Sequence, residues 1–196
     1  TWKHIDGIDD GELYHLYQLY SLHGQSKDAL AKTKAGAWEY DIVGPWYKCN
    51  MTDIMAAIGL VQLKRYPSLI QRRYEIVKKY DEAMDAMHIE HIQHISDVYH
   101  SSAHLYMIRI PDISVEQRNE IITRMAENGV ATNVHYKPLP MMSGYKAFGW
   151  DIKDFSNAYR LYHNEITLPL HTLLSDEDVE IVVQTLRNTL EEMKLL

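Results

Sequence analysis

Apolar residues recur at helical spacing in several parts of the chain, and the clearest example covers residues 52–65. Ile54, Ile58 and Val61 stand at i, i+4 and i+7, and neighbouring apolar residues widen this stripe around most of the helix. Thr52 precedes the stripe and is a favourable N-cap, because its hydroxyl can accept a hydrogen bond from a free first-turn amide. The pattern therefore predicts a helix that begins at Thr52 and is buried rather than surface-lying.

The same reasoning predicts helices on both sides of this one. A tyrosine-rich amphipathic helix is expected over residues 11–22, closing at His23-Gly24, and a long helix is expected from Ser68 to about Met87. Pro67 should end the helix over residues 52–65, since proline lacks the amide that continues the ladder. We expect a strand end and turn over residues 1–8, and an irregular loop over residues 25–43.

The second half of the chain alternates strand and helix signals, which describes a small α+β layer with a mostly antiparallel sheet. Ser114-x-x-Gln117 has the form of a capping box, and Asn128-Gly129 is a typical helix end. The expected elements are a strand over 104–110, a helix from Ser114 to Asn128, a strand over 130–136, a helix over 159–165, a strand over 166–168 and a helix capped at Ser175.

Composition narrows the functional classes. The 196 residues carry a net charge of −7 with no long basic run, which argues against a nucleic-acid groove. No apolar run approaches the roughly 20 residues of a membrane helix, and Thr1 begins no signal-peptide pattern. Cys49 is the only cysteine, so no intrachain disulfide can form, and a cytoplasmic setting fits.

Lys48 and Asn50 stand just ahead of the predicted helix N-terminus at Thr52. A cationic head, an amide donor and free backbone amides at one place suit a phosphate group. The alternative is that Lys48 is a solvated loop cation and Asn50 a turn residue.

A resemblance favours the phosphate. Gly44-x-x-x-Lys48-Cys49-Asn50-Met51-Thr52-Asp53-Ile54, then Ala56-Ala57-Ile58-Gly59-Leu60 and Gln62-Leu63, resembles a signature of the DegT/DnrJ/EryC1/StrS family. Members are mostly aminotransferases that use pyridoxal 5'-phosphate (PLP) on nucleotide-linked sugars. The resemblance implies the C-terminal portion of an α/β, aspartate-aminotransferase-like enzyme of fold type I. Residues 1–66 would be the tail of the large cofactor-binding domain, and residues 67–196 a small C-terminal α+β domain.

The resemblance also implies roles for particular residues. Lys48 and Asn50 would bind the cofactor, on a loop that reaches across a homodimer interface toward the partner's cofactor phosphate, although many members carry Asn at the position of Lys48. His135-Tyr136-Lys137-Pro138-Leu139-Pro140 is similar to the family's H-Y-x-P-L-H/P element near the nucleotide-sugar entrance. His135 and Tyr136 would then contact substrate, and the alternative is that they finish a strand and pack.

No lysine in the chain has the surroundings of the family's Schiff-base lysine, which is expected upstream of Thr1. The chain would therefore contain no catalytic residue of its own and would depend on the missing N-terminal half. The parent enzyme is expected to move an amino group, from an amino acid such as glutamate, to a keto sugar on a nucleotide in polysaccharide biosynthesis. The alternatives are a PLP-dependent sugar dehydratase of the same family, with histidine replacing the lysine, and a non-catalytic binding or interface fragment.

Two other clusters resemble sites less well. His88-x-x-His91-x-x-His94 has short spacing, but the lack of a nearby cysteine or a His-Glu-x-x-His arrangement favours solvated histidines over a zinc site. Cys49 and His23 could form a nucleophile and base, but no cysteine-enzyme signature surrounds Cys49, so we expect a bystander thiol and no metal.

Overall fold

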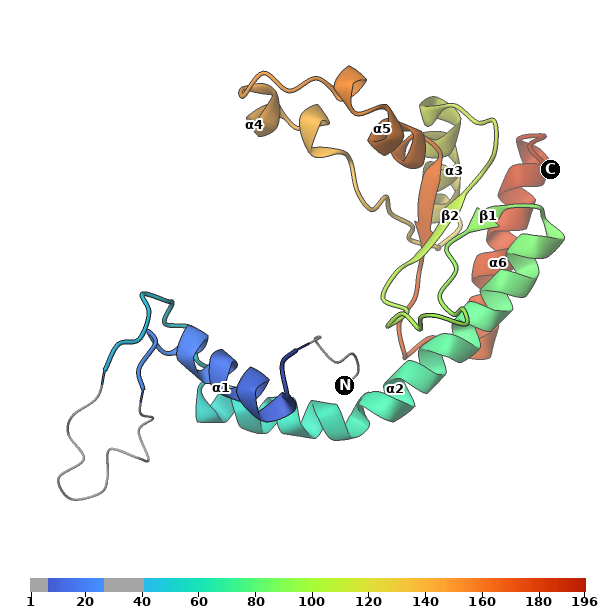
Figure 1. The fold of residues 1–196 in the computed structure, drawn as a ribbon. Helices are drawn as coiled ribbons and strands as arrows, with labels where there is room; N and C mark the ends of the chain where they lie inside the picture. Colours follow the sequence, from blue (N-terminus) through green and yellow to red (C-terminus); the bar gives the residue numbers. More distant parts are fainter. Residues whose placement is uncertain (1–6, 27–40) are drawn as a thin grey trace. The chain divides into compact units, whose positions relative to one another are not determined.

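The computed structural model describes residues 7–26 and 41–196, and it divides into two compact units between Lys64 and Arg65 (Figure 1). Helix α2 (Asp53–Ala86) contributes its first turns to unit 1 and the remainder to unit 2. The interpretation of the units as a cofactor-domain tail (1–66) and a small domain (67–196) stays a prediction. Most of the expected strand end at 1–8 and of the expected loop at 25–43 lies outside the described residues.

Unit 1 begins with helix α1 (Asp10–Ser21), which confirms the tyrosine-rich helix. The side chain of Asp9 caps it by accepting from the Glu12 amide. The helix closes at Gly24, whose φ of +70° favours glycine and whose amide donates to the Leu19 carbonyl at 2.7 Å. A Cβ at Gly24 would lie 2.3 Å from the Gly44 carbonyl oxygen, so a larger residue would displace the returning chain.

The returning chain pairs with the end of α1 and holds the candidate phosphate loop in place. Leu22 and Lys48 form an antiparallel bridge. The His23 amide donates to the Tyr47 carbonyl and the Cys49 amide to the Ser21 carbonyl, both at 2.8 Å. The position of Lys48 is therefore fixed by backbone hydrogen bonds on both of its neighbours.

Helix α2 runs without interruption through Pro67, so the prediction that Pro67 separates two helices is wrong. Proline at this position removes one hydrogen bond, the one that residue 67 would donate to the Leu63 carbonyl. Leu63 and Pro67 are both exposed, and water can take the place of that donor. The Ser68 hydroxyl donates to the Arg65 carbonyl at 2.8 Å, which adds a hydrogen bond to the helix beside the proline.

The predicted burial of the first part of α2 is also wrong for this chain. Six large apolar side chains of unit 1 are each at least 55% exposed: Ile54, Met55, Ile58, Leu60, Val61 and Leu63. The reason is that the described part of unit 1 supplies too few apolar side chains to cover this surface, and Leu19 is its one buried core residue.

Unit 2 is built on an antiparallel sheet in the order β1 (Glu90–His91), β2 (Tyr106–Arg109), β3 (Glu165–Leu168). This confirms the expected antiparallel layer, although the short β1 was not predicted. Helix α3 (Val115–Glu127) begins at the predicted Ser114–Gln117 capping box, and α6 (Asp176–Glu192) begins at the predicted Ser175 cap. Side chains of α2, α3 and α6 form one core with Tyr106, Ile108, Ile166 and Leu168 of the sheet.

The predicted strand over 130–136 does not form. Asn133 bridges to Thr167, but the next amides leave the ladder, and the His135 amide donates to the Glu165 carboxylate instead of a strand carbonyl. The helix predicted over 159–165 lies earlier, as α5 (Ser156–Tyr162), because Glu165 already belongs to β3.

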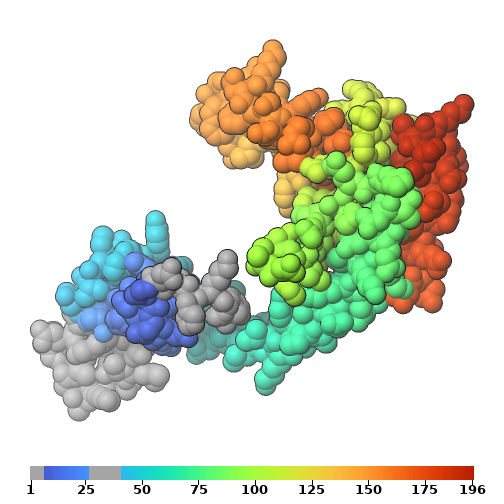
Figure 2. Space-filling view, turned by 45° about the vertical axis from the view of Figure 1, so that its right-hand side comes forward, coloured from blue at the N-terminus to red at the C-terminus, as the bar shows by residue number. Residues whose placement is uncertain are grey.

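Between Pro138 and α5 the chain forms short turns: η2 (Leu139–Met141), α4 (Ser143–Lys146) and η3 (Ile152–Asp154). Figure 2 shows this stretch, in orange, as a lobe that projects from unit 2. Among the described helices, none is both long and apolar enough to cross a membrane.

Candidate functional site

Unit 1 brings Lys48 and Asn50 together. The Lys48 ammonium donates to Asn50 Oδ1 at 2.8 Å, and both side chains are exposed. Thr52 then caps α2, since its hydroxyl accepts from the Met55 amide at 3.4 Å and its carbonyl accepts from the Ala56 amide. The ammonium, the Asn50 amide group and the first-turn amides of α2 are donors, and they form a set that fits a phosphate.

In unit 2, His135 and Tyr136 follow the Asn133 bridge and lie in different surroundings. Tyr136 is 72% exposed, whereas His135 is half-buried, and their rings meet edge to face at 4.7 Å. The peptide bond that joins the two residues is cis. His135 Nδ1 lies 2.9 Å from the Thr167 hydroxyl oxygen. His135 is thus held by β3, while Tyr136 is free to meet another molecule.

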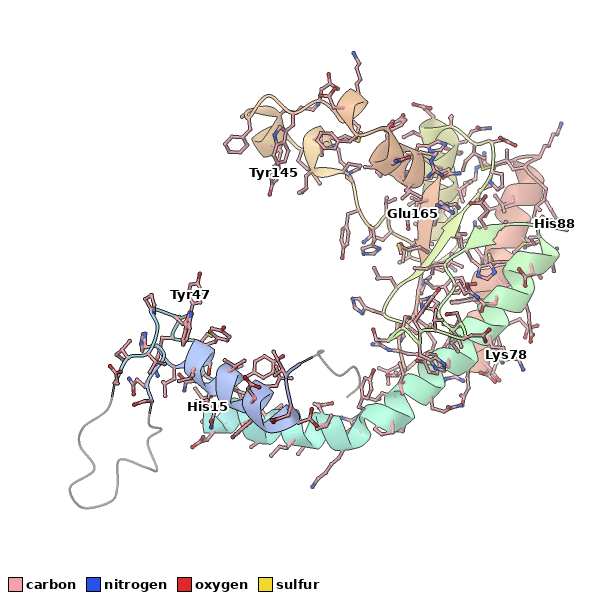
Figure 3. The ribbon with its side chains drawn as sticks, viewed as in Figure 1. His15, Tyr47, Lys78, His88, Tyr145 and Glu165 are labelled. Atoms are coloured by element: carbon pink, nitrogen blue, oxygen red, sulfur yellow. The ribbon has the colours of Figure 1, made fainter. Side chains whose placement is uncertain are left out.

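Glu165 is the buried carboxylate of this region and lies at the start of β3 (Figure 3). Its Oε1 accepts from the Thr167 hydroxyl at 2.5 Å, and its Oε2 accepts from the His135 amide at 2.9 Å. Burial raises the pKa of Glu165, and the hydrogen bonds from Thr167 and the His135 amide oppose that shift. The carboxylate therefore ties β3 to the loop that carries His135 and Tyr136.

Arg118, on α3, contacts the backbone where α5 ends and β3 begins. It is 1% exposed, and one of its terminal nitrogens donates to the carbonyls of Tyr162 and Glu165 at 3.1 and 3.2 Å. Its guanidinium lies 4.8 Å from the centre of the Tyr162 ring. Arg118 therefore connects α3, the end of α5 and the start of β3 through buried contacts.

Two pockets of unit 2 have His135 in their walls. One, of about 260 Å³, also contains His91, Arg109, Leu161 and Glu165. The other, of about 300 Å³, also contains His104, Asn133 and Thr167. His135 therefore lines both pockets, and its neighbours Glu165 and Thr167 each line one of them.

The prediction of solvated histidines holds for His88, which is exposed, but it is wrong for His94 and, in part, for His91. His94 is 3% exposed, and its Nδ1 lies 2.6 Å from the Ser101 hydroxyl. His91 lies 3.1 Å from the carboxylates of both Asp81 and Asp85, although its contact with Asp81 is not aligned as a hydrogen bond. Both rings stack on Tyr106, which explains their burial.

No other candidate forms a site. Within the described part of the chain, no three His, Cys, Asp or Glu side chains are grouped to hold a metal ion. Cys49 is an exposed free thiol, and among the described residues no hydrogen bond joins it to the His23 ring.

The sequence matches the DegT/DnrJ/EryC1/StrS aminotransferase family over residues 7–187. The chain belongs to this family. A family protein of Streptococcus pneumoniae, assigned as a sugar aminotransferase and solved in a PMP form, is 53% identical with a TM-score of 0.82. The match covers 100% of this chain and 49% of that one, and a PLP form of the same protein also matches, at 50% identity.

Curated family members also match this chain over about half of their own length. The spore coat polysaccharide biosynthesis protein SpsC of Bacillus subtilis is 35% identical over 92% of this chain and 47% of its own length. A UDP-4-amino-4,6-dideoxy-N-acetyl-beta-L-altrosamine transaminase of Campylobacter jejuni is 30% identical over 93% of this chain and 46% of its own. The chain spans about half the length of the curated relatives it matches, as expected for the C-terminal portion of a family enzyme.

Family membership does not assign individual residues, so the roles of Lys48, Asn50, His135 and Tyr136 stay predictions. Sequence reasoning missed Glu165, which it placed in a helix, and Thr167, which it treated as part of a plain strand. A usable signal was present, because a carboxylate and a hydroxyl at i and i+2 share one face of a strand. Its meaning depends on His135, which is 30 residues away in the sequence.

Proposed function

We propose that this chain is the C-terminal half of a PLP-dependent aminotransferase that moves an amino group, from glutamate, to a keto sugar carried on a nucleotide. The match to the aminotransferase family over residues 7–187 supports it most directly. Curated relatives named for UDP-linked amino sugars favour UDP as the nucleotide.

Lys48 and Asn50 would hold the cofactor phosphate, because their side chains meet shortly before α2 begins, and the Lys48 ammonium and the Asn50 NH₂ group can both donate to an anion. When bound, the cofactor supplies a carbonyl group that takes the amino group from the donor and passes it to the sugar. The lysine that anchors it would come from the other half of the enzyme, so residues 1–196 alone are expected to be inactive. His135 and Tyr136 would contact the nucleotide sugar.

We further propose that the enzyme is a homodimer in the cytoplasm. The loop that carries Lys48 and Asn50 would reach the cofactor of the partner subunit, so that each subunit completes its neighbour's site. A free thiol at Cys49, the only cysteine, suits a reducing compartment.

The test of the function uses the full-length parent enzyme with PLP, glutamate and a UDP-linked 4-keto sugar. We expect 2-oxoglutarate and the aminated sugar nucleotide in equal amounts, measured by mass spectrometry. Loss of a water-equivalent mass from the sugar, without amination, would instead identify a dehydratase. No conversion of several UDP- and TDP-linked keto sugars by the PLP-loaded enzyme would refute the proposal.

The cofactor site is tested by Lys48→Ala in the parent enzyme. Losing one charge-assisted hydrogen bond costs roughly 1.5–3 kcal/mol, so the Kd for PLP should rise about ten- to a hundredfold. The matched control is Lys64→Ala, which removes an exposed lysine of α2 in the same unit. Equal PLP affinities of the two variants would remove Lys48 from the site.

The dimer is tested by mixing two inactive proteins, one lacking the anchoring lysine and one altered at both Lys48 and Asn50. If the loop serves the partner, the mixed dimer has one doubly damaged site and one intact site, so activity should return after subunit exchange. Absence of activity despite exchange, shown by native mass spectrometry, would mean that the loop serves its own subunit.

A further inference from the structure

Three hydrogen bonds connect Glu165, Thr167 and His135. The Thr167 hydroxyl donates to Glu165 Oε1 at 2.5 Å, and the His135 amide donates to Glu165 Oε2 at 2.9 Å. The third contact joins His135 Nδ1 and the Thr167 hydroxyl oxygen at 2.9 Å. Glu165 is 4% exposed and Thr167 is 5% exposed, so water cannot readily replace these partners.

The directions of these hydrogen bonds determine which nitrogen of the His135 imidazole carries the proton. A hydroxyl has one proton, and Thr167 gives it to the Glu165 carboxylate, which has no proton to return. The Thr167 oxygen can then only accept from His135, so the neutral ring must carry its proton on Nδ1. Nε2 is left with its lone pair, and no side chain of the described residues bonds to it.

We propose that Glu165 and Thr167 are positioning residues that fix His135 as its Nδ1–H tautomer and present Nε2 as a hydrogen-bond acceptor. The consequence for substrate binding rests on the proposed function. His135 Nε2 would accept a hydrogen bond from a hydroxyl or amide N–H of the nucleotide sugar. Two pockets have His135 in their walls, so a ligand in either one lies beside this residue.

The first test needs no enzyme activity. The 196-residue chain is labelled with ¹⁵N, and long-range proton–nitrogen spectra of the histidine rings are recorded at about pH 8, where free histidine is neutral. His135→Gln assigns its signal among those of the eleven histidines. We expect the Nδ1–H pattern for His135. The Nε2–H pattern, which a protonated Glu165 would impose, overturns the proposal.

Glu165→Gln gives a sharper result, because the new amide oxygen can keep the bond from the His135 amide while its NH₂ group faces Thr167. The NH₂ group would donate to the hydroxyl, the hydroxyl would donate to Nδ1, and the His135 tautomer should invert to Nε2–H. A merely structural Glu165 would leave the ring pattern unchanged, and that outcome refutes the proposal. The amide spectrum of the variant shows whether its fold is retained.

A second pair of variants serves if Glu165→Gln fails to fold. Thr167→Val keeps the shape of the side chain and removes the hydroxyl, so His135 should lose its single tautomer, whereas Thr167→Ser should retain it. In the parent enzyme, Thr167→Val should raise KM for the sugar nucleotide about tenfold, with Thr167→Ser near wild type. If Thr167→Val loses the single tautomer but leaves KM unchanged, Thr167 positions His135 and His135 does not contact the substrate. If the wild-type parent enzyme is inactive, that result counts against the proposed function instead.

Discussion

Replacing Arg118 by Met should destabilise unit 2 strongly, although methionine fills a similar space and is a good helix former. Arg118 is 1% exposed and donates to the part-buried carbonyl of Tyr162 and to the buried carbonyl of Glu165. The variant would leave both carbonyls without this donor, at about 1–3 kcal/mol each. Loss of the contact with the Tyr162 ring adds to this cost. We expect the free energy of unfolding to fall by roughly 2–5 kcal/mol.

Urea denaturation followed by circular dichroism measures this change in the 196-residue chain. The control is Arg124→Met in the same helix, where the arginine side chain is 37% exposed and pairs with Glu120 at 2.8 Å and Glu192 at 3.5 Å. Exposed ion pairs contribute little, so the control should unfold almost as the wild type does. If Arg118→Met and Arg124→Met shift the transition equally, the buried contacts of Arg118 do not carry the stability assigned to them.

Two further predictions concern α2 and the buried histidine. Burial lowers the pKa of His94, against the opposing charge of Asp81, so the unfolded chain binds more protons than the folded one below the ordinary pKa of 6.5. The free energy of unfolding should therefore fall as the pH drops through that value. Urea midpoints measured from about pH 8 to 5 check this. They should fall less steeply in His94→Gln than in the exposed control His88→Gln. Pro67→Ala restores an amide to an exposed stretch of α2 and should stabilise it locally by roughly 1–3 kcal/mol, less the entropy that proline removes from the unfolded chain. Slower hydrogen exchange at residues 63–71 checks this, and unchanged exchange would mean that the helix already tolerates the proline without cost.

The elements that could be predicted are those whose signals lie within a few residues. The Ser114–Gln117 capping box forms as the sequence indicates, because each side chain bonds a backbone amide three residues away. The Gly24 and Gly129 helix ends follow from the same kind of local chemistry, since both residues have positive φ. The motif around Lys48 and Asn50 was also recognisable, and the structure adds that the two side chains meet.

The features that could not be predicted depend on distant partners. The chain over residues 130–136 has strand-like composition, but the His135 amide bonds to a carboxylate 30 residues away, and the ladder ends there. His94 is polar and was expected at the surface, yet it is buried because it hydrogen-bonds to Ser101 and stacks on the Tyr106 ring. Pro67 carries a strong stop signal, but the loss of one hydrogen bond is small beside the continuous turns on both sides.

The first part of α2 shows how a prediction can be wrong for the chain and still carry information. Its six exposed apolar side chains are already partly covered, so each would gain roughly 1–2 kcal/mol on full burial, on the order of 10 kcal/mol together. That is comparable to the whole stability of a typical domain, so a sequence with this pattern is adapted to a helix that is covered. The proposed function accounts for the covering surface, because the half of the enzyme that supplies the anchoring lysine and the partner subunit would both lie beside the Lys48–Asn50 loop that precedes α2. Under that proposal, the apolar pattern would describe the helix in the complete enzyme, and its exposed apolar face would be the surface through which this half joins the rest.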